Sequence, residues 1–222
     1  HDFFHPLEDD SLKQIFFNKP IVKHKHNLHR GCLWWRPDLT TEQDMFDIAA
    51  STQAVYEYIL KYISNWARWK SPSGNLILMG GCALNCSANG SIKGDWNDMY
   101  IMANPGDAGS AIGGVLAHKK QHLPLPHMYT GYNIEGEYPV EEALQELLTT
   151  GIVGVANSCA EFGPRAFGHR SLLADPRGTD IKDRVNEIKR RQKFRPFAPA
   201  VLEEHASAYF DGPTGPFMQY TS

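Results

Sequence analysis

Two arginines lie five residues apart in a segment rich in glycine and proline, Glu161-Phe-Gly-Pro-Arg-Ala-Phe-Gly-His-Arg-Ser171. The planar guanidinium group of arginine matches a pair of phosphate or carboxylate oxygens, and a serine hydroxyl nearby adds a further hydrogen bond. We therefore expect Arg165, Arg170 and Ser171 to bind a phosphorylated or carboxylated small molecule. The alternative is a structural ion pair between these arginines and Glu161 or Asp175, which the sequence leaves open.

Lys189 and Arg191 belong to the most basic segment of the chain, residues 177–195, which has eight basic and three acidic residues. Residues two positions apart cannot share a helical face, so a site that uses both requires the helix to end there. The Arg-Pro pair that follows favours such an end. A nucleic-acid surface is the alternative, but Phe194 and Phe197 are predicted to anchor an extended segment in the core. Nucleic acid is therefore not an expected partner.

Gly80 and Gly81 follow an apolar run of buried-strand type, residues 75–79. Glycine permits a turn with positive φ and lets a ligand approach the main chain. The N–H groups at the start of a following helix favour phosphate. This turn is therefore predicted to suit a nucleotide, with an ordinary strand-to-helix turn as the alternative.

Asp107 stands between Gly106 and Gly109 in a second turn, at the start of a predicted helix. A carboxylate at this place either caps the helix by accepting N–H groups or binds a hard cation beside bound phosphates. Both interpretations stay open for Asp107 alone. Two glycine-lined turns within 30 residues, one suited to phosphate and one with a carboxylate, favour a nucleotide site more than either turn does.

Strands and helices alternate around these motifs, which predicts an α/β fold. A capping pattern at residues 40–43 opens an amphipathic helix of about 25 residues. Hydrophobic periodicity and turn residues then predict strands over 75–79 and 98–102, a helix over 108–121, a linker without regular structure over 122–138, a helix over 140–148 and a strand over 151–156. A domain boundary is expected near residue 125.

The chain has 222 residues, a formal net charge of −3 and four cysteines. No apolar run reaches the roughly 20 residues of a membrane span, and the charge does not favour an anionic membrane or nucleic acid as a partner. Four cysteines are too few for a disulfide framework, so the cytoplasm is the predicted location. Histidines at positions 24, 26 and 29 suggest a metal site, but an exposed polar loop is favoured and they are assigned no function.

The two ends of the sequence lack the patterns of a complete domain. Residue 1 is histidine rather than methionine, and the run that follows has neither strand nor helix periodicity. An apolar segment resumes after the Gly/Pro cluster at residues 212–216, just before the last residue. We therefore expect a fragment of a longer protein or one subunit of a split enzyme.

The motifs, taken in order, resemble the carbamoyltransferase family, which includes the nodulation-factor and antibiotic O-carbamoyltransferases. The matching stretches, of which the Gly-Pro-Arg motif is highly specific, are residues 47–53, 75–86, 105–113, 161–177 and 191–199. The resemblance implies that residues 1–125 form the second half of an actin/Hsp70-like (ASKHA) nucleotide- and metal-binding domain. It implies that residues 126–222 begin the α+β, YrdC-like domain that activates carbamoyl phosphate.

The same resemblance implies a reaction and its partners. ATP and carbamoyl phosphate would form carbamoyl-adenylate with release of pyrophosphate, and the carbamoyl group would then pass to a hydroxyl of a small-molecule acceptor. The matching positions imply nucleotide contacts at Gly80, Gly81 and Asn85, and a ligand of a divalent metal, iron or else magnesium, at Asp107. They place the catalytic residues at the carbamoyl-phosphate and ATP end of the second domain: Arg165, Arg170, Ser171, Lys189 and Arg191.

The sequence also departs from the family pattern. Phe167 replaces the usual leucine, His169 the usual asparagine and Gln192 the usual glutamate. The family's metal site also needs a histidine pair, and His1 and His5 have its spacing but not its surrounding pattern. The metal site is therefore expected to be incomplete, with a second chain supplying the missing N-terminal half. The alternative function is a non-catalytic nucleotide-binding or regulatory module of the same fold.

Overall fold

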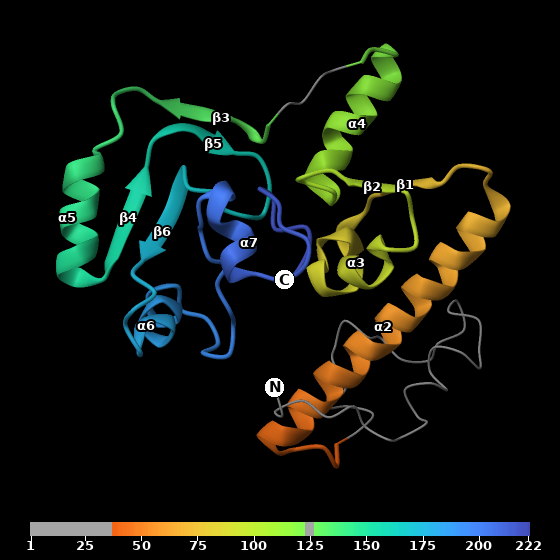
Figure 1. Cartoon of the computed structure of the whole chain (residues 1–222), viewed down its shortest axis with the longest axis horizontal. Helices are drawn as coiled ribbons and strands as arrows, with labels where there is room; N and C mark the ends of the chain where they lie inside the picture. Colours follow the sequence, from red (N-terminus) through yellow and green to blue (C-terminus); the bar gives the residue numbers. More distant parts are fainter. Residues whose placement is uncertain (1–36, 123–126) are drawn as a thin grey trace. The chain divides into compact units, whose positions relative to one another are not determined.

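The computed structural model describes residues 37–122 and 127–222 (Figure 1). These residues fall into two compact units. The described part of the first comprises residues 37–76 and 87–98, and the second comprises residues 77–86 together with 99–222 without the gap at 123–126. Helices and strands alternate along the chain, so the mixed α/β class is confirmed.

The first unit is dominated by α2, Glu42–Lys70, a helix of 29 residues. Thr41 and Asp44 form its capping box: the Thr41 hydroxyl accepts the Asp44 N–H at 3.1 Å, and the Asp44 carboxylate accepts the Thr41 N–H at 2.8 Å. The box therefore starts one residue later than the sequence pattern predicted. The indole N–H of Trp96, a buried residue, donates to the Ser64 hydroxyl of α2 at 2.8 Å.

Strands β1, Asn75–Leu78, and β2, Asp98–Ile101, pair in a two-stranded sheet. The 3₁₀ helix η3, Gly81–Leu84, and the helix α3, Cys86–Lys93, follow β1, while α4, Asp107–Lys119, follows β2. Both predicted strands and the predicted helix are confirmed to within two residues. The dividing line between the two units crosses β1 and β2.

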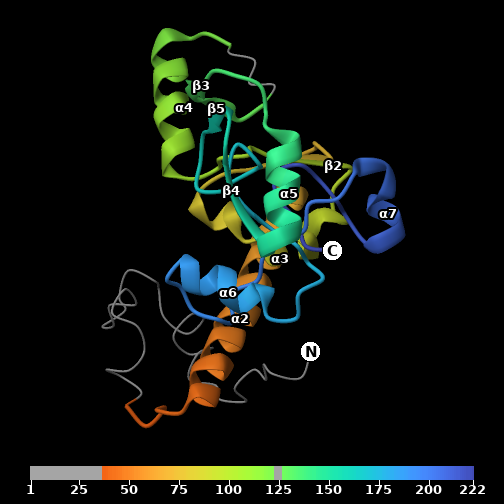
Figure 2. The ribbon, with the colours of Figure 1, turned by 90° about the vertical axis from the view of Figure 1, so that its left-hand side faces the viewer.

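The remaining strands form two antiparallel pairs. β3, Tyr129–Ile134, pairs with β5, Ser158–Glu161, and β4, Ile152–Ala156, pairs with β6, Arg170–Ala174. The helix α5, Val140–Thr150, runs alongside β4 in both views (Figures 1 and 2). The predicted helix and strand are confirmed here, but the prediction of no regular structure over 122–138 is wrong, because β3 lies within it. Five of the six β3 residues are exposed, so hydrophobic alternation does not reveal this strand.

Short elements complete the chain: α6, Ile181–Ile188, the 3₁₀ helix η4, Glu203–His205, and α7, Ala206–Tyr209. The last residues return to β2, where the Gln219 side chain donates to the Ile101 carbonyl and the Tyr220 hydroxyl donates to the Met99 carbonyl at 3.4 Å. Within the described residues, no helix has the length and hydropathy that a membrane span requires.

Candidate functional site

The two glycine-lined turns adjoin each other. The Gly80 N–H donates to the Pro105 carbonyl at 2.8 Å, and a Cβ on Gly106 would lie 3.7 Å from the Gly81 Cα. Gly80 has φ +102°, a conformation that side chains rarely adopt, so glycine is needed there. The turn after β1 and the turn after β2 therefore form one surface of the second unit.

The segment after Gly80 differs from the expected helix start. Gly81 opens η3, which has four residues and ends at Leu84. The N–H of the C-cap residue, Asn85, donates to the Cys82 carbonyl at 3.0 Å. The α-helix begins only at Cys86. The first turn after β1 thus carries a 3₁₀ turn where a longer helix with a phosphate-binding N-terminus was predicted. The nucleotide contacts at Gly80, Gly81 and Asn85 stay a prediction.

Asp107 is the first residue of α4, and Gly106 is the N-cap, without a side-chain cap. The exposed Asp107 carboxylate accepts no hydrogen bond from a described residue, so the capping interpretation does not describe its side chain. Its charge still interacts favourably with the positive end of the helix. In residues 37–122 and 127–222, no three His, Cys, Asp or Glu side chains group closely enough to hold a metal ion. Asp107 therefore offers one ligand, and His1, His5 and the histidines at 24–29 lie outside the described residues.

Arg165 connects three segments of the second unit through backbone carbonyls. Its Nη1 donates to the Met218 carbonyl at 2.7 Å and to the Phe217 carbonyl at 3.3 Å, while Nη2 donates to the Leu84 carbonyl. Leu84 ends η3, next to the glycine turns. The loop between β5 and β6, residues 162–169, carries the Gly-Pro-Arg motif and is called the Gly-Pro-Arg loop below. Through Arg165 it reaches the surface that Gly80 and Asp107 share. The guanidinium group is engaged by neutral oxygens rather than by a carboxylate.

The guanidinium group of Arg170 is likewise bound by backbone carbonyls, which here lie in and beside the strands. Its Nη1 donates to the carbonyls of Asn157 and His169, at 2.5 and 2.7 Å, and its Nη2 to those of Tyr132 and Ser158, at 2.9 and 3.1 Å. These bonds hold the connection between β4 and β5 against β3. These four bonds use the N–H groups of Nη1 and Nη2, so an anion would bind at the Nε–H or replace one of the carbonyls.

The ion-pair alternative is wrong for both arginines. Asp175 is paired with Arg177 instead. Hydrogen bonds from the side chain and the backbone N–H of Arg177, together with its positive charge, lower the pKa of Asp175 to about 2. The Ser171 hydroxyl accepts the Gly168 N–H at 2.9 Å, which places it inside the loop that carries the motif. The anion-binding role of these groups stays a prediction.

Glu161 organises the same loop through main-chain donors. One carboxylate oxygen accepts the N–H groups of Phe167, His169 and Arg170 at 2.6, 2.9 and 3.3 Å. Burial acts to raise the pKa of Glu161, but these three donors outweigh it, and the pKa lies below its usual value. Glu161 is therefore a negatively charged anchor for the loop.

Lys189 and Arg191 both lie beyond the end of α6 at Ile188, as a joint role requires. The Arg191 Cζ is 4.3 Å and the Lys189 Nζ 6.0 Å from the centroid of the Phe197 ring. Arg191 also donates from Nε to the Asn186 Oδ1 at 2.6 Å. The structure thus brings these two predicted residues together.

The prediction that Phe194 and Phe197 anchor the core is wrong, since both rings are exposed, by 57% and 38%. Phe197 packs against the cationic side chains of Arg191 and Lys189 instead. A Phe next to prolines resembles a core residue in sequence, whereas its partners here are charged.

Sequence reasoning missed an aromatic pair beside the Gly-Pro-Arg loop. The rings of Tyr129 and His169 stack with centroids 3.9 Å apart, and the Tyr129 hydroxyl donates to the Phe167 carbonyl at 3.1 Å. Burial, and secondarily the negative charge of Glu161, raise the pKa of Tyr129. The His169 Nδ1 lies 2.7 Å from the Cys159 carbonyl, so this nitrogen carries the proton. The replacement of the family's asparagine by His169 was the one signal available.

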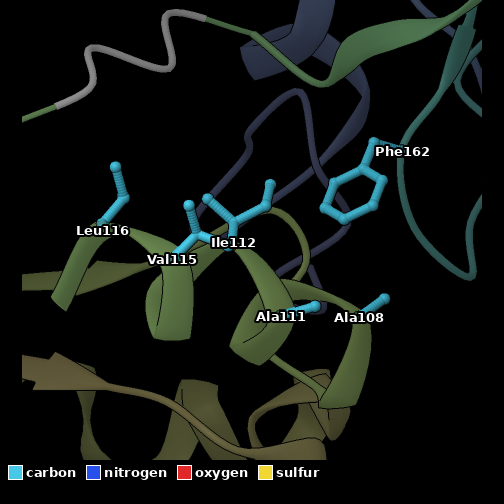
Figure 3. Close-up of a pocket in the computed structure, with 6 residues that line it drawn as sticks. All are labelled: Ala108, Ala111, Ile112, Val115, Leu116 and Phe162. Carbon is cyan, nitrogen blue, oxygen red and sulfur yellow. The ribbon is translucent and has the colours of Figure 1, made fainter. Parts of the chain in front are cut away.

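An apolar groove runs along α4 toward the same loop (Figure 3). It has a volume of about 460 Å³, and Phe162 faces the helix across it; its other lining residues, all on α4, are Ala108, Ala111, Ile112, Val115 and Leu116. Of its lining residues, Ala108 follows Asp107 and Phe162 precedes Gly163 in the sequence, so the groove includes neighbours of two of the predicted motifs.

Comparison with known proteins decides the family. A model described as the carbamoyltransferase N-terminus matches residues 9–116, and one described as the carbamoyltransferase C-terminus matches residues 144–222. The chain belongs to the carbamoyltransferase family. The predicted resemblance is therefore confirmed, and the four site segments of this carbamoyltransferase chain divide between the two models. The predicted boundary near residue 125 falls in the interval that neither model matches and stays a prediction.

Nodulation proteins are among the relatives of this carbamoyltransferase chain. It is 32% identical to nodulation protein NolO of Bradyrhizobium diazoefficiens over 83% of the chain and 40% of that protein. It is 33% identical to nodulation protein NolNO of Sinorhizobium fredii over 83% of the chain and 32% of that protein. Nodulation protein U of Bradyrhizobium diazoefficiens is 36% identical over 66% of the chain and 29% of its own length. The carbamoyltransferase chain thus spans between 29% and 40% of the length of these relatives.

Proposed function

We propose that the chain is part of an O-carbamoyltransferase that uses ATP and carbamoyl phosphate. Water cleaves carbamoyl phosphate to carbamate and inorganic phosphate. A carbamate oxygen then bonds to the α-phosphorus of ATP, and pyrophosphate leaves as carbamoyl-adenylate forms. The oxygen of an acceptor hydroxyl then bonds to the carbamoyl carbon, and AMP leaves. The acceptor is a small molecule that carries the hydroxyl group.

One observation carries the proposal: Arg165 of the C-terminal family segment donates to the Leu84 carbonyl of the N-terminal segment. This bond brings the Gly-Pro-Arg loop to the surface that the two glycine turns share. A transfer between an activating segment and an accepting segment requires such proximity, because the reactive carbamoyl group must be kept from water.

The proposed roles follow the positions of the side chains. Gly80, Gly81 and Asn85 would contact the nucleotide through the main chain. The cations would bind phosphate oxygens. Lys189 and Arg191 would do so from beside Phe197. Arg165 and Arg170 would use the guanidinium N–H groups that the carbonyls leave over, or exchange a carbonyl partner for the ligand. The Ser171 hydroxyl would add a hydrogen bond within the same loop.

The proposed metal, iron or magnesium, fits the described residues only in part. Asp107 is an exposed carboxylate suited to either cation, but a metal needs about three protein ligands. The described residues provide no such group. We propose that the other ligands come from residues 1–36 or from a second chain, which would also complete an actin/Hsp70-like domain.

A non-catalytic nucleotide-binding module is the second candidate. Two observations favour it: Asp107 has no companion ligands among the described residues, and both motif arginines are engaged by carbonyls. Such a module would bind ATP or carbamoyl phosphate without consuming them.

The test is the release of pyrophosphate by the full chain, measured with ATP and carbamoyl phosphate together and with each alone. We expect binding without turnover from the chain alone, and pyrophosphate release once the chain is combined with a polypeptide that supplies the missing ligands. An Asp107→Asn variant of the same mixture is the matched control. Binding without pyrophosphate release in every mixture would favour the non-catalytic module.

A further inference from the structure

The C-terminal half of α2 carries three exposed aromatic side chains on one face. Tyr62, Trp66 and Trp69 are exposed by 67%, 55% and 75%, and we call them the aromatic face. At about 100° per residue, the three side chains leave the helix within about 60° of one another. Such large apolar side chains, gathered on one exposed surface, are typical of an interaction site.

The aromatic face lies opposite the side of α2 that packs on the rest of its unit. Ser64, a buried residue, accepts the indole N–H of Trp96 at 2.8 Å and therefore marks the packed side. Around the helix, Ser64 is between about 140° and 160° away from each of the three aromatic side chains. The packing of α2 on Trp96 thus leaves the aromatic face uncovered.

The charges of α2 divide between its two halves. Residues 42–57 contain four acidic residues and no basic one, whereas residues 58–70 contain three basic residues and no acidic one. The helix dipole favours acidic residues in the first turn and basic residues in the last, but it does not require aromatic rings among the cations. The half of α2 that carries the aromatic face therefore has a net charge of +3.

The cations of this half adjoin the aromatic face. The Lys70 Nζ is 4.2 Å from the centroid of the Trp69 ring, and the side chains of Lys61 and Arg68 are exposed. Exposed tryptophan and tyrosine beside lysine and arginine are typical of helices at a membrane–water interface. There the rings lie among the lipid headgroups, and the long cationic side chains extend to the phosphates.

We propose that the aromatic face of α2 binds an anionic lipid surface. Tyr62, Trp66 and Trp69 insert among the headgroups, while the cations of residues 58–70 pair with lipid phosphates. The helix lies in the plane of the interface and does not cross it. The net charge of −3 does not favour an anionic membrane for the whole chain, but this attraction acts within about 10 Å and is local to one half of α2. The inference does not depend on the proposed function.

A second copy of the chain fits the same face less well. Pairing of two copies through the aromatic face would bring their segments 58–70 together, with three cations on each side and no acidic residue in either segment. Like charges at this contact repel each other. An anionic lipid surface turns the same charges into an attraction.

The test measures sedimentation of the full chain with two kinds of vesicle: phosphatidylcholine alone, and phosphatidylcholine mixed with phosphatidylglycerol in equal parts. We expect binding to the mixed vesicles that weakens as salt is added, and little binding to phosphatidylcholine alone. Lys61→Gln should weaken binding to the mixed vesicles about fivefold, the contribution of one cation near an anionic surface. Tyr62→Gln should weaken it by about fivefold or more, because a ring is no longer buried among the headgroups.

Tyr132→Gln and Lys182→Gln are the matched controls. Tyr132 is 82% exposed on β3, and Lys182 is an exposed residue of α6 in the basic segment 177–195. Both controls should bind the mixed vesicles as the wild type does. Thermal melts of all four variants should match that of the wild type, because each replaced side chain is exposed.

The outcomes distinguish this surface from other ways of binding. If Tyr62→Gln and Lys61→Gln bind the mixed vesicles as tightly as the wild type, or if Lys182→Gln loses as much affinity as Lys61→Gln, the inference is overturned. It is also overturned if the wild type binds neither kind of vesicle. If Tyr62→Gln leaves vesicle binding unchanged and instead prevents self-association or assembly with the polypeptide that completes the enzyme, the aromatic face is a protein interface. Vesicles enter no step of the pyrophosphate measurement, so the proposed function is tested separately.

Discussion

The guanidinium group of Arg191 lies over the ring of Phe197, with 4.3 Å between Cζ and the ring centroid. The same side chain donates to the Asn186 Oδ1 at 2.6 Å. A ring on one side and an amide on the other hold Arg191 in one orientation just beyond the end of α6. The contacts with Phe197 and Asn186 therefore orient the Arg191 guanidinium group, which is predicted to bind phosphate.

Replacing Phe197 tests this orientation. Phe197→Leu removes the cation–π contact, worth about 0.5–1 kcal/mol at an exposed site, and should lower the affinity for carbamoyl phosphate by a few-fold. Phe197→Tyr keeps the ring and should retain the wild-type affinity. Calorimetric titration of both variants measures the effect, and equal affinities in the two would show that the ring does not position Arg191.

Arg165 offers a prediction about stability. Lysine has one nitrogen and cannot reach the carbonyls of Leu84, Phe217 and Met218 together, so Arg165→Lys should lower the free energy of unfolding by about 1–3 kcal/mol. Arg177→Lys is the matched control, because Arg177 is exposed and an ion pair at the surface contributes little to stability. Urea unfolding of the two variants gives the comparison. Equal losses would mean that the carbonyl contacts of Arg165 do not connect the three segments.

The sequence predicted the helices and strands that a short stretch of residues is enough to specify. β1 and β2 are short apolar runs, α4 is a stretch of small residues that follows a turn, and α5 follows a segment rich in turn residues, so all four were predicted to within two residues. β3 was missed because its sequence, Tyr-Thr-Gly-Tyr-Asn-Ile, has little alternation and depends on pairing with β5. Such pairing is a tertiary effect that no short window contains.

The sequence predicted which segments adjoin in the candidate site, but not the hydrogen-bond partners of their side chains. The two glycine turns were singled out together, and they do adjoin through Gly80 and Pro105. The partners of Arg165 lie 81 and 53 residues away in the sequence, at Leu84 and Met218, so spacing could not reveal them. Asn104 follows the apolar run of β2 and precedes a proline, a pattern typical of an exposed turn. The structure shows instead that Asn104 is buried.

Asp107 should act as a metal ligand and not as a helix cap. Asp107→Asn removes a charge from the first turn of α4, so the free energy of unfolding should fall by no more than about 1 kcal/mol. In the assembled enzyme the variant should lose the divalent metal and the transfer activity, since an amide is a poorer ligand than a carboxylate. Asp98→Asn, at an exposed position of β2, controls for the loss of charge. Metal analysis that finds full occupancy in Asp107→Asn would contradict the ligand role.

Glu161 should make the stability of the chain depend on acid pH. Its folded-state pKa lies below the usual value, because three backbone N–H groups favour the charged form over the effect of burial. The stabilisation is therefore complete above the unfolded pKa of about 4.3, and it is lost as the pH falls through the lower folded pKa. Glu161→Gln cannot titrate and keeps only a weaker acceptor for the N–H groups of Phe167 and His169.

Thermal melts between pH 7 and about pH 2 would measure this dependence. At pH 7 the wild type should melt above Glu161→Gln, and the difference should shrink steadily as the pH falls below about 4.3. Asp175→Asn is the comparison, because the pKa of Asp175 is lowered to about 2 by Arg177 and its own contribution persists to lower pH. A difference between wild type and Glu161→Gln that stays constant down to pH 2 would mean that the charge of Glu161 does not hold the Gly-Pro-Arg loop.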